Sequence, residues 1–167
     1  MFKRKPEQET PADQPNANGT SPVDAALRDE LGLYHLWYLE LRLTEELARA
    51  ARTESVFSLA AWQLRVLPGE TPHSDLLEQA AKLITGSLRN YDIPSRIDAV
   101  RFVAILFDAD LADASTVAFR IKGDLQLRAA SAGKWQAGVA TFQRDGLDAD
   151  ALISATLRRL EEDARAA

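Results

Sequence analysis

The segment Arg89-Asn90-Tyr91-Asp92-Ile93-Pro94-Ser95-Arg96-Ile97-Asp98-Ala99-Val100-Arg101-Phe102 is the most informative stretch of this chain. Its first four residues form the one Arg-x-x-Asp pattern in the sequence. Apolar periodicity predicts an amphipathic helix before it, over 75–88, and a strand after it, over 99–107. A tight turn between such elements lies at an exposed edge of a domain, so Arg89 and Asp92 are candidates for a ligand site. The alternative is a surface ion pair, worth under about 1 kcal/mol.

The segments on either side of this stretch predict an α/β (α+β) fold, with a central mixed sheet flanked by helices. Residues 1–22 are rich in Pro, Glu, Gln, Asn and Thr, so they are predicted to be a disordered tail, and 23–167 a single folded domain. Two further strands are expected over 56–66 and 135–142, and three further helices over 23–52, 112–127 and 148–165, with a break in the first helix at Gly32.

Composition limits the classes of function. The net charge of -5 argues against broad nucleic-acid binding, which needs a basic face. The chain has no cysteine and only two histidines, so we expect no disulfide, no Cys-ligated zinc and no metal centre built from histidines. No metal site and no cofactor are predicted. No apolar run approaches the roughly 18–20 residues that cross a bilayer, and no secretory signal is recognisable, so a cytoplasmic protein is expected.

In their order and spacing, these segments resemble the GGDEF domain, the diguanylate cyclase domain of bacteria. That family has Arg-x-x-Asp, four residues, one variable position and then Gly-Gly-Asp/Glu-Glu-Phe; here the five signature positions are 98–102, and only Phe102 is kept. The segment 29–34 resembles the family's entry motif, and 136–140 resembles its Ser-Ile-Gly-Val-Ala strand. The resemblance covers about 29–167 and implies a nucleotide-cyclase-like fold.

The same resemblance implies that the catalytic residues are absent. In the family, two carboxylates bind the metal ions that activate a 3′-hydroxyl against the α-phosphate of GTP, because Mg²⁺ takes hard oxygen ligands. Here the first of these positions falls at about Trp62, and the signature carboxylates are replaced by Val100 and Arg101. The two signature glycines are Asp98 and Ala99. The chain is therefore predicted not to be an enzyme, and GTP binding without turnover is kept as a minor alternative.

The regulatory residues, in contrast, are retained. Family enzymes carry a product-inhibition site in which cyclic di-GMP binds the Arg-x-x-Asp turn and a further arginine. Guanidinium groups offer forked donors to phosphate and to the guanine edge. The resemblance assigns this ligand to Arg89, Asp92 and Arg120, with Arg96 as a further candidate that equally fits a salt bridge. It implies a cyclic di-GMP receptor or signalling adaptor that acts through a partner protein or a ligand-linked homodimer.

The alternative is a scaffold for protein interaction or dimerisation that binds no nucleotide. The first long helix is apolar on more than one side, which exceeds what one core needs. Its expected contact residues are Leu33, Leu36, Trp37, Leu39 and Leu43.

Overall fold

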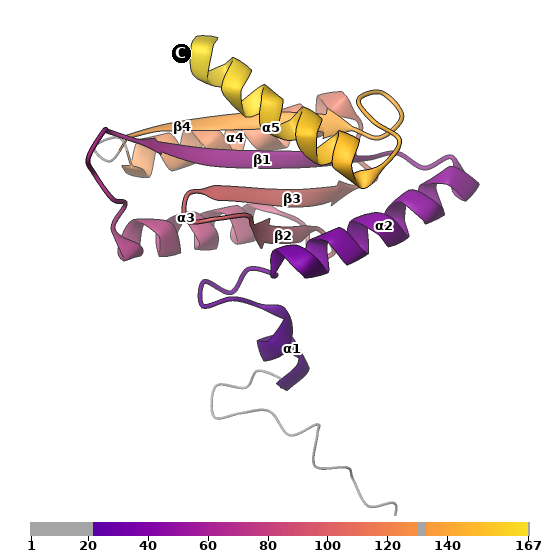
Figure 1. The fold of residues 1–167 in the computed structure, drawn as a ribbon, viewed down its shortest axis with the longest axis horizontal. Coiled ribbons are helices and arrows are strands. Elements are labelled where there is room, and N and C mark those ends of the chain that lie inside the picture. The colour runs from indigo at the N-terminus through magenta and orange to yellow at the C-terminus, as the bar shows by residue number, and fades with distance from the viewer. Residues whose placement is uncertain (1–21, 130–132, 167) are drawn as a thin grey trace, which may run out of the picture.

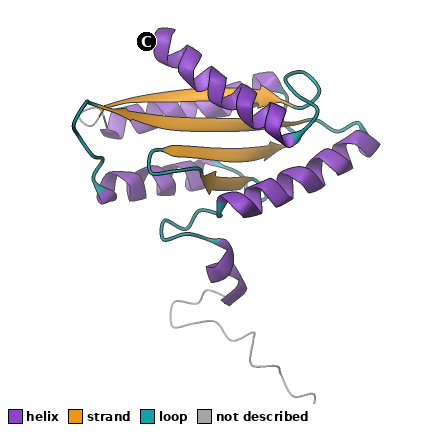
Figure 2. Ribbon diagram, in the orientation of Figure 1, coloured by secondary structure: helices purple, strands orange, loops and turns teal. Residues whose placement is uncertain are grey.

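The computed structural model describes residues 22–129 and 133–166, and these form one sheet with helices on both faces (Figures 1 and 2). The sheet has the strand order β2-β3-β1-β4, and its three pairings are antiparallel. An isolated bridge between Tyr34 and Ser95 adds a parallel contact at the β2 edge. The strands are β1 (Phe57–Val66), β2 (Ile93–Arg96), β3 (Arg101–Phe107) and β4 (Gly133–Thr141). The predicted fold class, a central sheet flanked by helices, is confirmed.

Five helices lie in the described part of the chain, and they divide between the two faces of the sheet. They are α1 (Pro22–Leu27), α2 (Leu36–Thr53), α3 (Ser74–Ser87), α4 (Leu111–Ala129) and α5 (Ala149–Ala166). Helices α3 and α4 pack on one face, and α2 and α5 pack on the other. None of these helices combines the length and the apolar character needed to cross a bilayer.

Strand β1 supplies both apolar cores, because successive side chains of a strand point to opposite faces. Trp62 and Leu64 pack with α3 and α4, whereas Leu59 and Ala61 pack with α2 and α5. Trp62 is fully buried, and its indole N–H donates a hydrogen bond of 2.9 Å to the backbone oxygen of Ala118. Trp62 is therefore a core residue that joins β1 to α4.

Helix α5 approaches β4 closely at Gly138. A Cβ at this position would lie 2.5 Å from the backbone oxygen of Thr156, so only glycine fits under the helix. The crossing fixes the path of α5, which runs diagonally over the sheet and leaves the end of the sheet where β3 begins uncovered on this face (Figure 1). That uncovered end forms one of the two pockets described below.

The structure corrects the sequence prediction at one strand and confirms it at one helix break. Strand β2 was predicted as part of a turn, because it has only four residues and contains Pro94, which cannot donate a ladder hydrogen bond. It forms because it is an edge strand, where proline is tolerated. The helix predicted over 23–52 is divided by a loop that contains Gly32, whose φ is +78°, so the break predicted there is confirmed. The predicted tail lies outside the described residues, except for Pro22, where α1 begins.

The contact face predicted for the first long helix is largely wrong. Leu33, Leu39 and Leu43 are fully buried and belong to the two cores. Trp37 does face solvent, with 52% of its surface exposed, and its ring lies edge-on to that of Tyr38. The apolar excess that the sequence shows on this helix therefore serves mainly to pack it on the sheet.

Candidate functional site

The turn between α3 and β2 is held in shape by the carboxylate of Asp92. One oxygen accepts a hydrogen bond of 2.9 Å from the backbone N–H of Arg89, and the other accepts one of 3.3 Å from the backbone N–H of Phe107. The N–H of Asp92 in turn donates to the backbone oxygen of Arg89 at 3.0 Å. Asp92 is only 6% exposed, so it ties the Arg-x-x-Asp turn to the end of β3.

Burial raises the pKa of the Asp92 carboxyl above its ordinary value, because it penalises the charged form. The backbone N–H groups of Arg89 and Phe107, and the charge of Arg89, act in the opposite direction but do not outweigh it. Each carboxylate oxygen can accept more than one hydrogen bond, so the two backbone contacts leave room for a ligand donor.

Two arginines stand beside this turn without an ionic partner among the described residues. One guanidinium nitrogen of Arg89 donates to the hydroxyl of Tyr91 at 3.0 Å and lies 3.5 Å from the backbone oxygen of Phe107. Arg120, from α4, donates to the backbone oxygen of Ser87 at 3.3 Å. Both side chains are exposed and contact only neutral acceptors. Their positive charges remain available to an anion.

Arg89, Asp92 and Arg120 line a single pocket of about 260 Å³ between α3, α4 and the end of β3. Small-molecule pockets commonly measure roughly 300–1,000 Å³, so this one encloses part of a larger ligand. The structure thus brings together three of the four predicted site residues, Arg89, Asp92 and Arg120. That they bind a ligand remains a prediction. The pocket is completed by Ser87, Leu88, Leu106, Phe107, Ala109, Asp113 and Val117.

Arg96 lies outside this pocket. Its guanidinium forms an ion pair of 3.1 Å with Asp29 and a second ion pair with Glu30. Asp29 also accepts hydrogen bonds from the backbone N–H groups of Leu31 and Leu33. Arg96 therefore anchors the loop between α1 and α2 to the edge of the sheet, as the salt-bridge alternative predicts.

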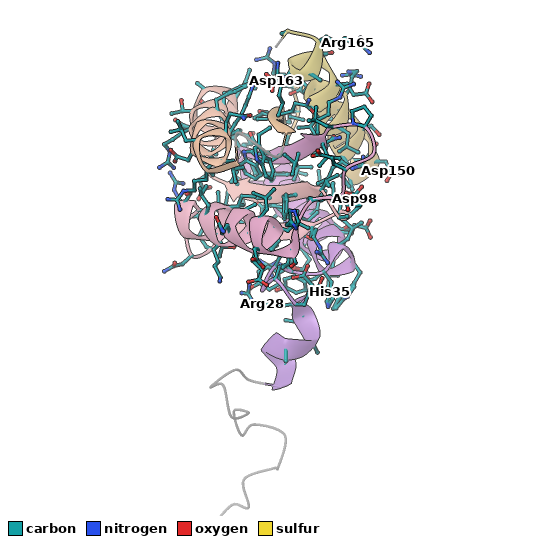
Figure 3. All side chains as sticks on the ribbon, turned by 90° about the vertical axis from the view of Figure 1, so that its left-hand side faces the viewer. Arg28, His35, Asp98, Asp150, Asp163 and Arg165 are labelled. Carbon is teal, nitrogen blue, oxygen red and sulfur yellow. The ribbon has the colours of Figure 1, made fainter. Side chains whose placement is uncertain are left out.

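The hairpin between β2 and β3 is closed by Asp98. One carboxylate oxygen accepts the backbone N–H groups of Val100 and Arg101, both at 3.0 Å, and the other accepts the Arg101 side chain at 2.7 Å. Burial alone would raise the pKa of Asp98, but these hydrogen bonds and the Arg101 charge outweigh it and hold the pKa below its ordinary value. Figure 3 looks onto this end of the molecule, with Asp98 at the hairpin.

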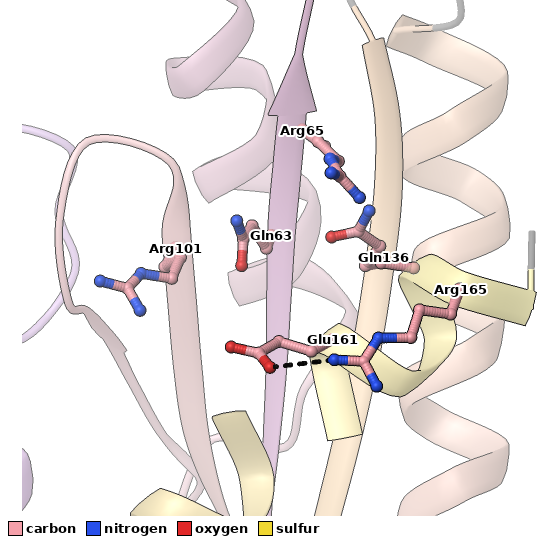
Figure 4. A pocket seen from close by; sticks show the side chains of 7 residues that line it. Gln63, Arg65, Arg101, Gln136, Glu161 and Arg165 are labelled. Atoms are coloured by element: carbon pink, nitrogen blue, oxygen red, sulfur yellow. Dashed lines mark ion pairs between the residues drawn. The ribbon is translucent and has the colours of Figure 1, made fainter. Parts of the chain in front are cut away.

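A second pocket, of about 460 Å³, lies on the uncovered end of the sheet beside the last turns of α5 (Figure 4). The sequence did not indicate which side chains line it, although GTP binding without turnover was kept as an alternative. The available signal was a set of polar residues at alternate positions of otherwise apolar strands, which places them on one face. Its lining residues are Gln63, Arg65, Arg101, Gln136, Glu161, Ala164 and Arg165.

No family model and no curated protein matches this chain. Several solved structures do match it. A sensory box/GGDEF family protein from Caulobacter crescentus is 19% identical with a TM-score of 0.68, over 84% of this chain and 99% of that one. The diguanylate cyclase SiaD from Pseudomonas aeruginosa, solved with its activator SiaC, is 22% identical with a TM-score of 0.73, over 86% of this chain and 60% of that one. The GGDEF domain of DgcB from Caulobacter crescentus, in complex with c-di-GMP, is 15% identical with a TM-score of 0.73, over 84% and 89%. The chain has the GGDEF-domain fold.

These comparisons contradict the prediction that the chain is not an enzyme, because the similar structures include diguanylate cyclases. That prediction depended on the replaced signature residues at 98–101 and on counting residues along β1, which assigned a metal-binding position to Trp62. The assignment fails physically, since Trp62 points into the core while the next residue, Gln63, faces the second pocket. A shift of one residue along a strand moves a side chain to the opposite face.

The side chains that line the second pocket do not fit Mg²⁺, which the fold family uses with GTP. Magnesium takes hard oxygen ligands, chiefly carboxylates, and is repelled by cations. The pocket has one carboxylate, Glu161, and three arginines. Within 22–129 and 133–166, no group of three or more Asp, Glu or His side chains is placed to hold a metal ion.

Proposed function

We propose that this chain is a signalling domain that binds cyclic di-GMP in the pocket of Arg89, Asp92 and Arg120. One observation carries the proposal: the turn held by Asp92 presents Arg89 beside Arg120, and neither guanidinium has an ionic partner in the described part of the chain. The likeness to the DgcB domain, which was solved with this ligand, supports the choice of nucleotide.

The chemistry of the pocket suits a guanine nucleotide. Arginine forks bind phosphate oxygens or the O6 and N7 atoms of guanine, and their planar groups stack on purine rings. The free lone pairs of the Asp92 carboxylate can accept the N1 and N2 hydrogens of guanine. Apolar contact would come from Leu106 and Val117, which line the same pocket.

The size of the pocket bears on what the bound ligand does. A volume of about 260 Å³ is below the usual small-molecule range of roughly 300–1,000 Å³, so part of a cyclic dinucleotide would stay outside the pocket. We propose that this remainder contacts a second copy of the domain or a protein partner. Ligand binding would then be linked to dimerisation or to partner binding.

The test is isothermal titration of cyclic di-GMP into the purified full chain, its Arg89→Ala and Arg120→Ala variants, and a control, Arg158→Ala. Arg158 is an exposed arginine of α5 that forms a 3.9 Å ion pair with Glu162. Loss of one charge-assisted contact is expected to weaken binding about 10-fold or more in each pocket variant and leave the control unchanged. Absence of binding to the unaltered chain, or equal binding by all four proteins, would refute the proposal.

A second candidate function, a scaffold that binds no nucleotide, is favoured by one observation. Trp37 and Leu41 are exposed by 52% and 48% and lie one turn apart on α2. Light scattering of the unaltered chain and of Trp37→Ala, each with and without cyclic di-GMP, separates the two functions. Association that is independent of ligand and lost in Trp37→Ala supports the scaffold.

A further inference from the structure

Tyr91 lies inside the Arg-x-x-Asp turn and contacts neighbours through both its ring and its hydroxyl. The ring stands edge-on to that of Phe107, with the two centroids 6.4 Å apart, which is a favourable geometry for an aromatic pair. The hydroxyl accepts a hydrogen bond of 3.0 Å from Nη1 of Arg89. Tyr91 is nevertheless 53% exposed, and it does not line the pocket of about 260 Å³. Any effect of Tyr91 on a ligand in that pocket would therefore pass through Arg89.

Phe107 ties this turn to the buried end of β3. Its backbone N–H donates to the carboxylate of Asp92 at 3.3 Å, and its backbone oxygen lies 3.5 Å from the same Nη1 of Arg89. Its ring adds the contact with Tyr91. Phe107 is only 8% exposed, so the Tyr91 hydroxyl is held against a rigid element of the sheet and not against a free loop.

The contacts of Arg89 occupy one end of its guanidinium. Both the Tyr91 hydroxyl and the Phe107 carbonyl meet Nη1. Within 22–129 and 133–166, neither Nε nor Nη2 of Arg89 donates a hydrogen bond. A guanidinium binds a phosphate group or a guanine edge through two parallel N–H groups, and Nε and Nη2 form such a pair. The arrangement therefore holds the arginine and leaves this pair of donors for a ligand.

A second arginine and tyrosine in the chain show the contrast with a purely structural pair. Arg28 donates from Nη2 to the hydroxyl of Tyr34 at 2.7 Å and from Nη1 to the backbone oxygen of Gly32 at 2.8 Å. Its guanidinium carbon lies 3.9 Å from the centre of the Tyr34 ring. Both terminal nitrogens of Arg28 are thus used within its own loop, and neither Arg28 nor Tyr34 lines the pocket.

We propose that Tyr91 is a positioning residue, whose hydroxyl orders the Arg89 guanidinium before a ligand arrives. This inference rests on the proposed function, because it assigns the order of Arg89 to the affinity of the proposed cyclic di-GMP pocket. A long flexible side chain loses conformational freedom when it binds, and a side chain that is already held loses less. The tyrosine hydroxyl then strengthens binding without touching the ligand.

The first experiment needs no ligand. It measures the ¹⁵N relaxation of the arginine Nε–H groups in the full chain and in Tyr91→Phe, with the Arg89 resonance assigned by its loss in Arg89→Ala. Phenylalanine keeps the ring that contacts Phe107 and removes only the hydroxyl. The order parameter of the Arg89 Nε–H is expected to fall in Tyr91→Phe and to stay unchanged in the matched control, Tyr34→Phe. Equal order parameters in Tyr91→Phe and the unaltered chain would overturn the proposal.

The second experiment is titration of cyclic di-GMP into the same proteins and into the double variant of Arg89→Ala with Tyr91→Phe. Tyr91→Phe is expected to weaken binding about 3- to 10-fold, and Tyr34→Phe to leave it unchanged. In the Arg89→Ala background, Tyr91→Phe should have no further effect, because the hydroxyl acts only through Arg89. Thermal unfolding of each variant shows that a weaker signal is not lost folding.

The two experiments separate the failure of this inference from the failure of the proposed function. Absence of binding by the unaltered chain would refute the proposed function, and the relaxation measurement would still decide whether Tyr91 orders Arg89. Where the unaltered chain does bind, equal affinity in Tyr91→Phe would overturn the positioning role. So would an equal loss in the presence and absence of Arg89, because the hydroxyl would then act on the fold and not through the arginine.

Discussion

The two pockets differ in how far the chain satisfies its own polar groups. In the first, both oxygens of Asp92 accept backbone N–H groups, and Arg120 donates to a backbone oxygen. In the second, Arg65 and Gln136 make no side-chain hydrogen bond within the described residues. Residues of the first pocket therefore also maintain the fold, whereas the side chains of Arg65 and Gln136 hold no turn or strand in place. Substitutions at the two places should affect stability very differently.

The largest difference is expected between Asp92→Ala and Arg65→Ala. Removing the Asp92 carboxylate leaves the backbone N–H groups of Arg89 and Phe107 without an acceptor in a buried turn. An unsatisfied buried donor costs about 1–3 kcal/mol, so we expect Asp92→Ala to lower the free energy of unfolding by about 2–4 kcal/mol. Arg65→Ala removes an exposed side chain that forms no hydrogen bond or ion pair within 22–129 and 133–166, and a change within about 0.5 kcal/mol is expected.

Urea unfolding followed by circular dichroism measures both values. The comparison fails if Asp92→Ala is as stable as Arg65→Ala, because the carboxylate would then contribute nothing to the turn. Loss of cyclic di-GMP binding in Asp92→Ala would not by itself locate the ligand, since the turn is altered. Substitutions of Arg89 and Arg120 are the better test of where the ligand binds.

The next largest effect is expected at Arg96, which the sequence presents as a ligand candidate and the structure places in an ion pair. Arg96→Ala removes its contacts with Asp29 and Glu30, and so loosens the loop before α2. We expect a loss of about 1 kcal/mol in the free energy of unfolding. The affinity for cyclic di-GMP should not change. A weaker titration signal from a stably folded Arg96→Ala would return this residue to the ligand site.

Features that depend on local sequence could be predicted, whereas features that depend on strand pairing could not. Long periodic segments gave all the helices and three of the strands, because burying an apolar face dominates their energetics. Strand β2 was missed because its pairing with β3 is a tertiary effect that four residues with a proline do not encode. Arg89 and Asp92 could be placed together because one local turn holds both.

The second pocket could not be predicted in this way, because its residues meet only through strand register. Gln63 and Gln136 are far apart in the chain, and their pairing requires β4 to lie antiparallel beside β1. The same missing register led to Trp62 being assigned a place at the active-site surface. Counting along a strand does not tell which face a residue occupies unless the inward face is known.

The smallest expected effect is on the pH dependence of stability. It distinguishes Asp92, in the turn before β2, from Asp98, in the hairpin between β2 and β3, because the pKa of Asp92 is raised and that of Asp98 is lowered. Burial raises the pKa of Asp92, so its stabilising contribution is present below the ordinary pKa near 3.9 and is lost as the pH rises through the folded-state value. Asp98 has a lowered pKa, so its contribution is present above about 3.9 and is lost as the pH falls through the folded-state value. Titration of the carboxyl carbon resonances by NMR should place the pKa values of the two aspartates on opposite sides of the ordinary value.

For Asp98, whose side chain is 39% exposed, solvent screening limits the stability difference to under about 1 kcal/mol. When the pH is lowered from about 5 to about 2, the free energy of unfolding of Asp98→Asn should therefore fall slightly less than that of the unaltered chain. Identical pH profiles for the two proteins would show that the Asp98–Arg101 pair does not stabilise the hairpin, and the Arg101 charge would then be held less firmly beside the second pocket.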